Sequence, residues 1–359
     1  MSKDEYLITD APLKALTVFA MPMILGSFFQ QVYNMADSII VGQFVGSSAL
    51  AAVGACAALT NVFICIALGA GVGAGVLVSR YFGARDYGKM KTIVSTSLIS
   101  FLVLSVLLGV FGAALATLIA QGISAVFSLL IFFSRMRRYK SRFEWFDRHE
   151  LHSMLRIAVP SVLQQSTVSI GMMIVQAVVN PFGTQALAGY SATMRVENVF
   201  SLIFVSIGNA VSPFVSQNLG AKKTERIKKG YHAALVLDLC FAVLAFIVIE
   251  TLHTQISSLF LGKDGTALAY QVSGDYMRWL GFFFIFMGIK MATDGVLRGL
   301  GIMRPFLAAN MVNLAIRLSV ALICAPRFGI AFVWLAVPAG WLANFLISYV
   351  ALRKSWPAE

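Results

Sequence analysis

Long apolar stretches dominate this chain and decide what it can fold into. Several approach the 20 or so residues that a helix needs to cross a bilayer, and residues 93–133 contain no charged side chain. Apolar residues make up 58% of the 359 residues and charged residues 12%, about half the charged fraction of a soluble domain. This composition excludes a soluble globular protein, a disordered chain and a disulfide scaffold, and it indicates a helical membrane protein.

The apolar stretches predict about ten spans. Turn-forming and charged residues separate most of them, but the third and fourth abut, so the chain must turn between them, and Gly109 to Gly112 is the expected place. The predicted spans are 15–41, 49–79, 92–110, 112–134, 155–180, 186–216, 231–250, 275–298, 303–324 and 328–352.

Positive charges alternate between the two sides of the predicted membrane. Of the 28 Lys and Arg residues, 22 fall at the termini and in the loops on one side, and only Lys263 and Arg327 fall in loops on the other. The positive-inside rule therefore predicts an inner or plasma membrane protein with both termini in the cytoplasm. Since topology accounts for the net charge of +12, no nucleic-acid partner is expected.

The chain repeats itself at long range. Residues 46–55 (GSSALAAVGA) match 183–192 (GTQALAGYSA) at an offset of 137, and SRYFGA (79–84) matches SQNLGA (216–221) at the same offset. AMP (20–22) matches AVP (158–160) at an offset of 138. Both copies enter the membrane from the same side, so we expect two parallel halves related by an axis along the membrane normal.

The offset then jumps, which predicts a gap in the first half. FGAALATLIA (111–120) matches FGIAFVWLAV (328–337) at an offset of 217. The first half is therefore about 80 residues short, or about two spans with their loops, which leaves four spans against six. We expect an incomplete N-terminal lobe at 1–134, a basic cytoplasmic linker at 135–154 and a complete C-terminal lobe at 155–359.

Several motifs together resemble the multidrug and toxic compound extrusion (MATE) family: YNMADSIIVGQFVG (33–46), SRYFGARDYGK (79–89), FGAALATLIAQ (111–121), VSQNLGAKK (215–223) and VLRGLGIMRP (296–305). The resemblance implies an all-α polytopic fold with two helical lobes around a central cleft. It also implies export of small organic compounds, driven by inward flow of Na⁺ or H⁺. The chain departs from the pattern where two spans of the first lobe are missing.

A polar face on the first span is the candidate cation site. Gln30, Tyr33, Asn34 and Asp37 are spaced i, i+3, i+4 and i+7, so they share one helical face. A carboxylate with amide oxygens suits Na⁺, and a carboxyl group in a dry cavity can instead carry a proton. The resemblance also places a cation-coupling acid here, and Thr117 is a further candidate. No cofactor is expected besides the coupling ion.

Other polar residues within spans are candidates for the substrate cavity, because intramembrane charges are costly. Lys290 lies four residues before Asp294, which favours an ion pair within one helix, and Arg317 has Asp238 and Asp294 as candidate partners. Arg195 and Glu197 are two residues apart and point to different faces. The cavity candidates are Asp294, Glu197, Arg195 and Gln31.

The sequence thus predicts a monomeric cation-coupled antiporter, in contact with membrane lipid, that exports amphipathic cationic drugs or toxic organic compounds. It contains no HExxH or GxSxG motif, so we expect no enzyme. Two alternatives stay open. One is a flippase of related architecture for a lipid-linked substrate, and the other is a remnant that lost transport with its missing spans.

Overall fold

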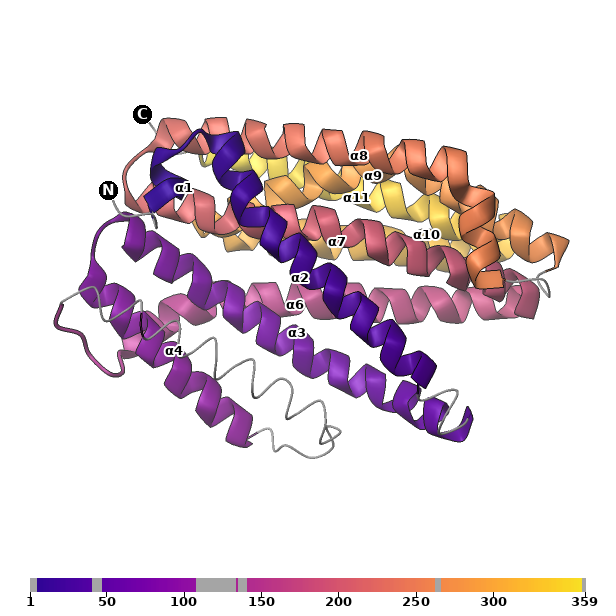
Figure 1. Ribbon diagram of the computed structural model, residues 1–359, viewed down its shortest axis with the longest axis horizontal. Coiled ribbons are helices and arrows are strands. Elements are labelled where there is room, and N and C mark those ends of the chain that lie inside the picture. Colours follow the sequence, from indigo (N-terminus) through magenta and orange to yellow (C-terminus); the bar gives the residue numbers. More distant parts are fainter. Residues whose placement is uncertain (1–4, 41–46, 108–133, 135–140, 262–265, 357–359) are drawn as a thin grey trace.

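The computed structural model shows a chain of long helices (Figure 1). It describes residues 5–40, 47–107, 134, 141–261 and 266–356, and side chains within these ranges except at 34–40, 47–63 and 104–107. The helices are α1 (Tyr6–Thr9), α2 (Pro12–Ile40), α3 (Ser47–Gly83), α4 (Tyr87–Leu107), α6 (Arg148–Val179), a 3₁₀ turn (Asn180–Phe182), α7 (Thr184–Gly220), α8 (Thr224–Leu261), α9 (Ala267–Leu300), α10 (Met303–Phe328) and α11 (Ala331–Lys354).

Nine of the ten predicted spans coincide with a helix in the part of the chain that is described. The remaining span, 112–134, and the turn expected at Gly109 to Gly112 lie outside it. Within that part, eight helices are long and apolar enough to cross a membrane. Eight of the predicted spans are therefore confirmed as helices able to cross a membrane, and the span at 92–110 is confirmed as a helix, α4.

Polar side chains and glycines fix the helix ends. Asp147 caps α6, since its Oδ1 accepts hydrogen bonds from the backbone N–H groups of His149 at 2.7 Å and Glu150 at 3.4 Å. Thr266 caps α9 in the same way through the N–H of Ala269. These caps satisfy N–H groups that a helix start leaves without a partner.

The second half forms a bundle with α9 at its centre. Helices α7, α8 and α11 all pack against α9, and α10 packs against α11 and α6. Helix α8 lies on the outside of this bundle (Figure 1), and Val236, Leu239 and Val243 on it remain exposed. A band of exposed aliphatic side chains on an outer helix is what contact with lipid requires.

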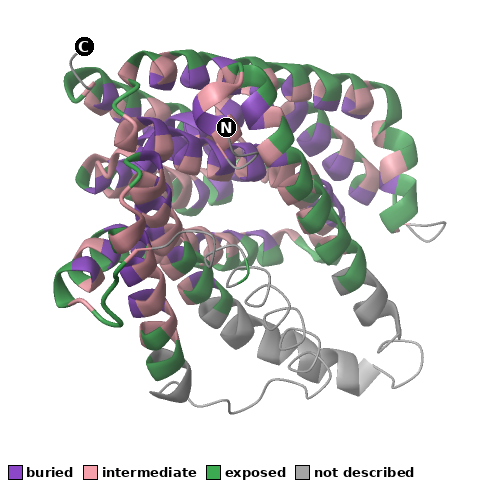
Figure 2. Cartoon of the chain, turned by 60° about the vertical axis from the view of Figure 1, so that its left-hand side comes forward, coloured by how far each residue is buried: buried purple, intermediate pink, exposed green. Residues whose placement is uncertain are grey.

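Two apolar cores occupy the two ends of the molecule. The first joins the halves, because Leu16 of α2 and Val76 of α3 pack in it with Phe214 of α7 and Phe306 of α10. The second core, around Tyr276, draws its buried residues from α6–α11. The joined end is the one at which both termini lie (Figure 1), and we call it the terminal end. Figure 2 shows that buried residues gather in the second-half bundle.

The two halves meet at the terminal end through matching residues. Gly83, at the end of α3, lies against the main chain of Gln217 in α7, and Gly220 lies in the same way against Arg80. At the repeat offset of 137, Arg80 in the first half corresponds to Gln217 in the second, and Gly83 corresponds to Gly220. A Cβ atom on either glycine would overlap the opposing carbonyl oxygen. This symmetrical contact is the one expected for parallel repeats about a common axis.

The turns after α3 and α7 repeat as well. Arg85 and Lys222, again 137 residues apart, have φ values of 57° and 56°, in the left-handed region that residues other than glycine seldom adopt. In each turn the next N–H bonds to the carbonyl five residues earlier, at 3.0 Å in the first and 2.8 Å in the second. Both are Schellman-type helix ends. The two halves therefore repeat the backbone conformation of this turn as well as its sequence.

Side chains at matching positions tie each half to the other at this end. The Tyr81 hydroxyl on α3 donates to Glu150 on α6 at 2.7 Å. Asn218 on α7, the match of Tyr81, donates to the carbonyl of Leu7 in α1 at 3.0 Å. Arg80 reaches the C-terminal turn of α9 and donates to the carbonyl of Leu300 at 3.1 Å. The terminal end is therefore closed by polar as well as apolar contacts.

Candidate substrate and ion sites

The predicted cation site lies only partly within the described side chains. Gln30 and Tyr33 are exposed on α2, and Gln31 is half-buried. The other predicted members fall outside the described side chains: Asn34, Asp37 and Thr117. The cation site and its possible Na⁺ ligand therefore stay predictions.

Asp294 forms a buried ion pair with Lys290 one helical turn earlier. Their Nζ and Oδ2 atoms are 2.9 Å apart, and each side chain is only 2% exposed. Asn310 of α10 donates to Oδ2 and Ser348 of α11 donates to Oδ1, both at 3.3 Å. The pairing predicted from the i, i+4 spacing is present at Oδ2, and the hydrogen bond from Ser348 gives Oδ1 a partner as well.

Glu197 belongs to a second, separate polar group among aromatic rings. It is 3% exposed, and its Oε2 accepts a hydrogen bond of 2.5 Å from the Tyr276 hydroxyl. The Tyr276 ring stacks between Tyr190 and Trp334, with centroids 5.6 and 5.3 Å away. Arg195 is exposed, so the expected separation of Arg195 and Glu197 onto different faces is observed.

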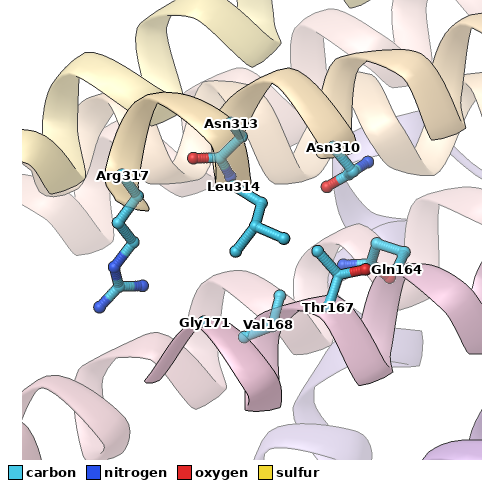
Figure 3. A pocket seen from close by; sticks show the side chains of 8 residues that line it. All are labelled: Gln164, Thr167, Val168, Gly171, Asn310, Asn313, Leu314 and Arg317. Carbon is cyan, nitrogen blue, oxygen red and sulfur yellow. The ribbon is translucent and has the colours of Figure 1, made fainter. Parts of the chain in front are cut away.

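A polar pocket lies between α6 and α10 (Figure 3). Its volume of about 20 Å³ is enough for roughly one water-sized group. One charged residue lines it, Arg317, whose Nε and Nη2 atoms are buried without a hydrogen-bond partner among the described residues. Amide and hydroxyl groups make up most of the remaining polar lining: Gln164, Thr167, Asn310 and Asn313.

Comparison with known proteins places this fold in a family. The family model MatE matches residues 22–135 and 160–323, which together cover most of the chain. The chain belongs to the MATE family. It is a multi-pass membrane transporter and not an enzyme, as the motifs predicted. The model matches twice, once in each half of the repeat.

Curated relatives of this MATE protein cover it almost completely. It is 24% identical to the probable multidrug resistance protein YpnP of Bacillus subtilis, over 84% of this chain and 85% of that one. It is 22% identical to the probable multidrug resistance protein YoeA of the same organism, over 96% of this chain and 94% of YoeA.

A solved structure confirms the MATE fold. It is described as the outward-facing conformation of a multidrug resistance MATE family transporter of the MOP superfamily. The TM-score is 0.87 at 20% identity, covering 99% of this chain and 98% of the other. The predicted all-helical polytopic class is confirmed.

The pocket in this MATE protein contains none of the four predicted cavity residues. Its α10 members, Asn310, Asn313 and Arg317, follow i, i+3, i+7 spacing, the pattern that marked the polar face of α2. The same reading applied to the span at 303–324 would have found them. Gln164 and Thr167 on α6 are also three residues apart and share a face, but only the fold shows that α6 faces α10.

Neither acid considered as a partner of Arg317 is paired with it. Asp294 is engaged by Lys290. Asp238 on α8 is 1% exposed, and neither of its carboxyl oxygens has a partner in the described part of the molecule. It faces Gly288 of α9 and Phe204 of α7. An ionised carboxylate in such surroundings would be prohibitively costly, so we expect Asp238 to be neutral.

Replacing Asp238 by asparagine is therefore expected to change the free energy of unfolding by less than about 1 kcal/mol. An asparagine has nearly the shape of a neutral carboxyl group, and no ion pair is broken. Reversible unfolding of the purified protein in mixed micelles measures this. A loss of several kcal/mol would contradict the neutral state and point to an ionic partner.

Proposed function

We propose that the chain is a cation-coupled antiporter that exports amphipathic, cationic organic compounds across the cell membrane, with the terminal end in the cytoplasm. Membership of the MATE family supports transport, and two relatives are named probable multidrug resistance proteins. The 22 positive charges on the side of the termini support the orientation.

The observation that carries the proposal is the symmetrical contact of the halves at one end. Gly83 and Gly220 bring α3 and α7 into backbone contact there, while the core at the other end draws its buried residues from the second half. The halves also touch midway along α3 and α6, where a Cβ atom on Gly69 would overlap Val162. Two parallel lobes with a symmetrical contact at one end suit alternating access, in which the lobes rock about a central site.

Asp37 is the proposed coupling residue. Ion binding to its carboxylate favours one arrangement of the lobes, and the compound is released outward from that arrangement. The lobes then rock back to accept another compound. A ligand shifts such an equilibrium only by its differential affinity for the two states, so the proposal requires that the ion bind one arrangement more tightly.

Ethidium efflux from cells that express the chain tests the proposed function. We expect efflux that depends on an imposed Na⁺ or H⁺ gradient and is lost in Asp37→Asn, because the amide can neither carry a proton nor supply a charged ligand. The ion whose gradient drives efflux is then the coupling ion.

Asp275→Asn is the matched control, since it removes an exposed carboxylate from α9, and it is expected to keep efflux. Equal ethidium accumulation in cells with the wild type, Asp37→Asn and empty vector would reject the proposal. If the protein is present in the membrane, that result favours a remnant without a transport cycle.

We also propose that the first lobe, residues 1–134, works with four spans. The comparison with YoeA extends over 440 aligned positions, at least 81 more than the 359 residues of this chain. This excess supports the deficit of about 80 residues read from the repeat offsets. Gradient-driven efflux by this chain would mean that four spans suffice.

A further inference from the structure

The pocket between α6 and α10 holds a positive charge that the described protein does not neutralise. Arg317 lies 14 residues into α10, roughly 21 Å from its start, within the membrane-spanning part. Two of its guanidinium nitrogens, Nε and Nη2, are buried without a partner, and no described carboxylate lies within 4 Å of it. A charge at such a depth is costly and marks a site by default.

Two buried acids of the second half are already engaged. Asp294 lies behind Asn310, which donates to it, and it is paired with Lys290. Glu197 accepts the short hydrogen bond from Tyr276, and both Glu197 and Arg317 act electrostatically on that tyrosine. Arg317 therefore keeps Nε and Nη2, the two nitrogens on one edge of its guanidinium, free for a group that enters the pocket.

The rest of the lining suits an anion. Gln164, Asn310 and Asn313 carry amide groups that can donate hydrogen bonds, Thr167 carries a hydroxyl, and none of the lining residues is acidic (Figure 3). A guanidinium recognises a carboxylate or similar anion with two parallel N–H···O bonds. With a volume of about 20 Å³, the pocket is too small for a whole drug molecule and can admit only the tip of an end group.

We propose that this pocket binds an anionic group, such as a carboxylate, of the compound that the protein transports. The proposal rests on the proposed export function and narrows its substrates to amphipathic compounds that carry an acidic group besides any positive charge.

A matched pair of dyes tests the proposal. Rhodamine B carries a xanthylium cation and a free carboxylate, and its ethyl ester carries the same cation with the carboxylate blocked. Fluorescence anisotropy measures the Kd of each for the purified full-length protein. We expect the wild type to bind rhodamine B at least tenfold more tightly than the ester, the scale of a charge-assisted hydrogen bond.

Variants of Arg317 identify the group responsible. Arg317→Gln is expected to weaken rhodamine B binding about tenfold or more and to leave the Kd of the ester within twofold. Arg317→Lys keeps the charge but loses the planar pair of donors, so an intermediate loss is expected. Arg327→Gln, at the exposed end of the same helix, serves as the control and should change neither Kd.

The outcomes separate this site from the transport function. Equal weakening of both dyes in Arg317→Gln, or a wild type that binds rhodamine B no better than the ester, overturns the proposal. Chloride that raises the unfolding midpoint of the wild type but not of Arg317→Gln, without any dye preference, assigns the site to a free anion and also overturns it. Carboxylate-selective binding without gradient-driven efflux would support the site and reject the export function alone.

Discussion

Replacing Asp294 by asparagine is expected to lower the free energy of unfolding by about 3–5 kcal/mol, because it leaves the Lys290 ammonium buried without a counter-charge. Both side chains are 2% exposed, so water cannot compensate for the loss. The same substitution at Asp238, which is equally buried but unpaired, is expected to cost far less. Unfolding of both variants under the same conditions gives the comparison directly.

A double variant shows that the cost comes from the broken pair. Lys290→Met removes the ammonium, so Lys290→Met with Asp294→Asn is expected to be more stable than Asp294→Asn alone. The amide oxygen can still accept a hydrogen bond from Ser348 or Asn310. Additive losses in the double variant would mean that the two charges do not stabilise each other.

Alanine at Gly83 or at Gly220 is expected to lower the free energy of unfolding by about 1–3 kcal/mol, the usual cost of overpacking. Each new Cβ atom would overlap a main-chain carbonyl oxygen of the opposite half, and a backbone atom cannot rotate away. Since both glycines serve one contact, the double variant should cost less than the sum of the two. We also expect slower ethidium efflux, because the halves are forced apart.

Gly75→Ala is the control on the same helix. No heavy atom lies within 4 Å of the Cβ position there, so only helix propensity changes, by up to about 1 kcal/mol in favour of the helix. If Gly83→Ala proved as stable as Gly75→Ala, the backbone contact between α3 and α7 would not hold the halves together.

The sequence predicted the helices well because each span is long and bounded by polar or turn-forming residues. The repeat offset of 137 predicted more, since it paired Arg80 with Gln217 and Gly83 with Gly220, and the structure places these residues in mutual contact. The offset did not indicate that Gly83 lies against Gln217 and Gly220 against Arg80. That contact depends on the pseudo-symmetry axis passing between α3 and α7, which periodicity alone does not locate.

The candidate sites were harder to predict, because the contacts of an intramembrane polar residue depend on which other helices face it. The i, i+4 spacing of Lys290 and Asp294 is local, so their ion pair was predictable. The partners of Arg317 are not local: its pocket is completed by Gln164 on a helix about 150 residues earlier in the chain. Arg317 pairs with neither of its two candidate acids in the described part of the molecule. Asp294 is paired with Lys290, and Asp238 has no partner.

Because the terminal end is closed, a movement of α3 relative to α7 would be smallest at that end and largest at the opposite one. Helix α3 has 37 residues and is about 55 Å long. Gly83 is its last residue and lies in the closed contact. A tilt of α3 by about 10° around Gly83 would move its opposite end by roughly 10 Å, given this length. Atoms beside Gly83 would move little. Because α3 also packs against α6 along its middle, where a Cβ atom on Gly69 would overlap Val162, α3 and α6 would have to tilt together for such a movement to occur.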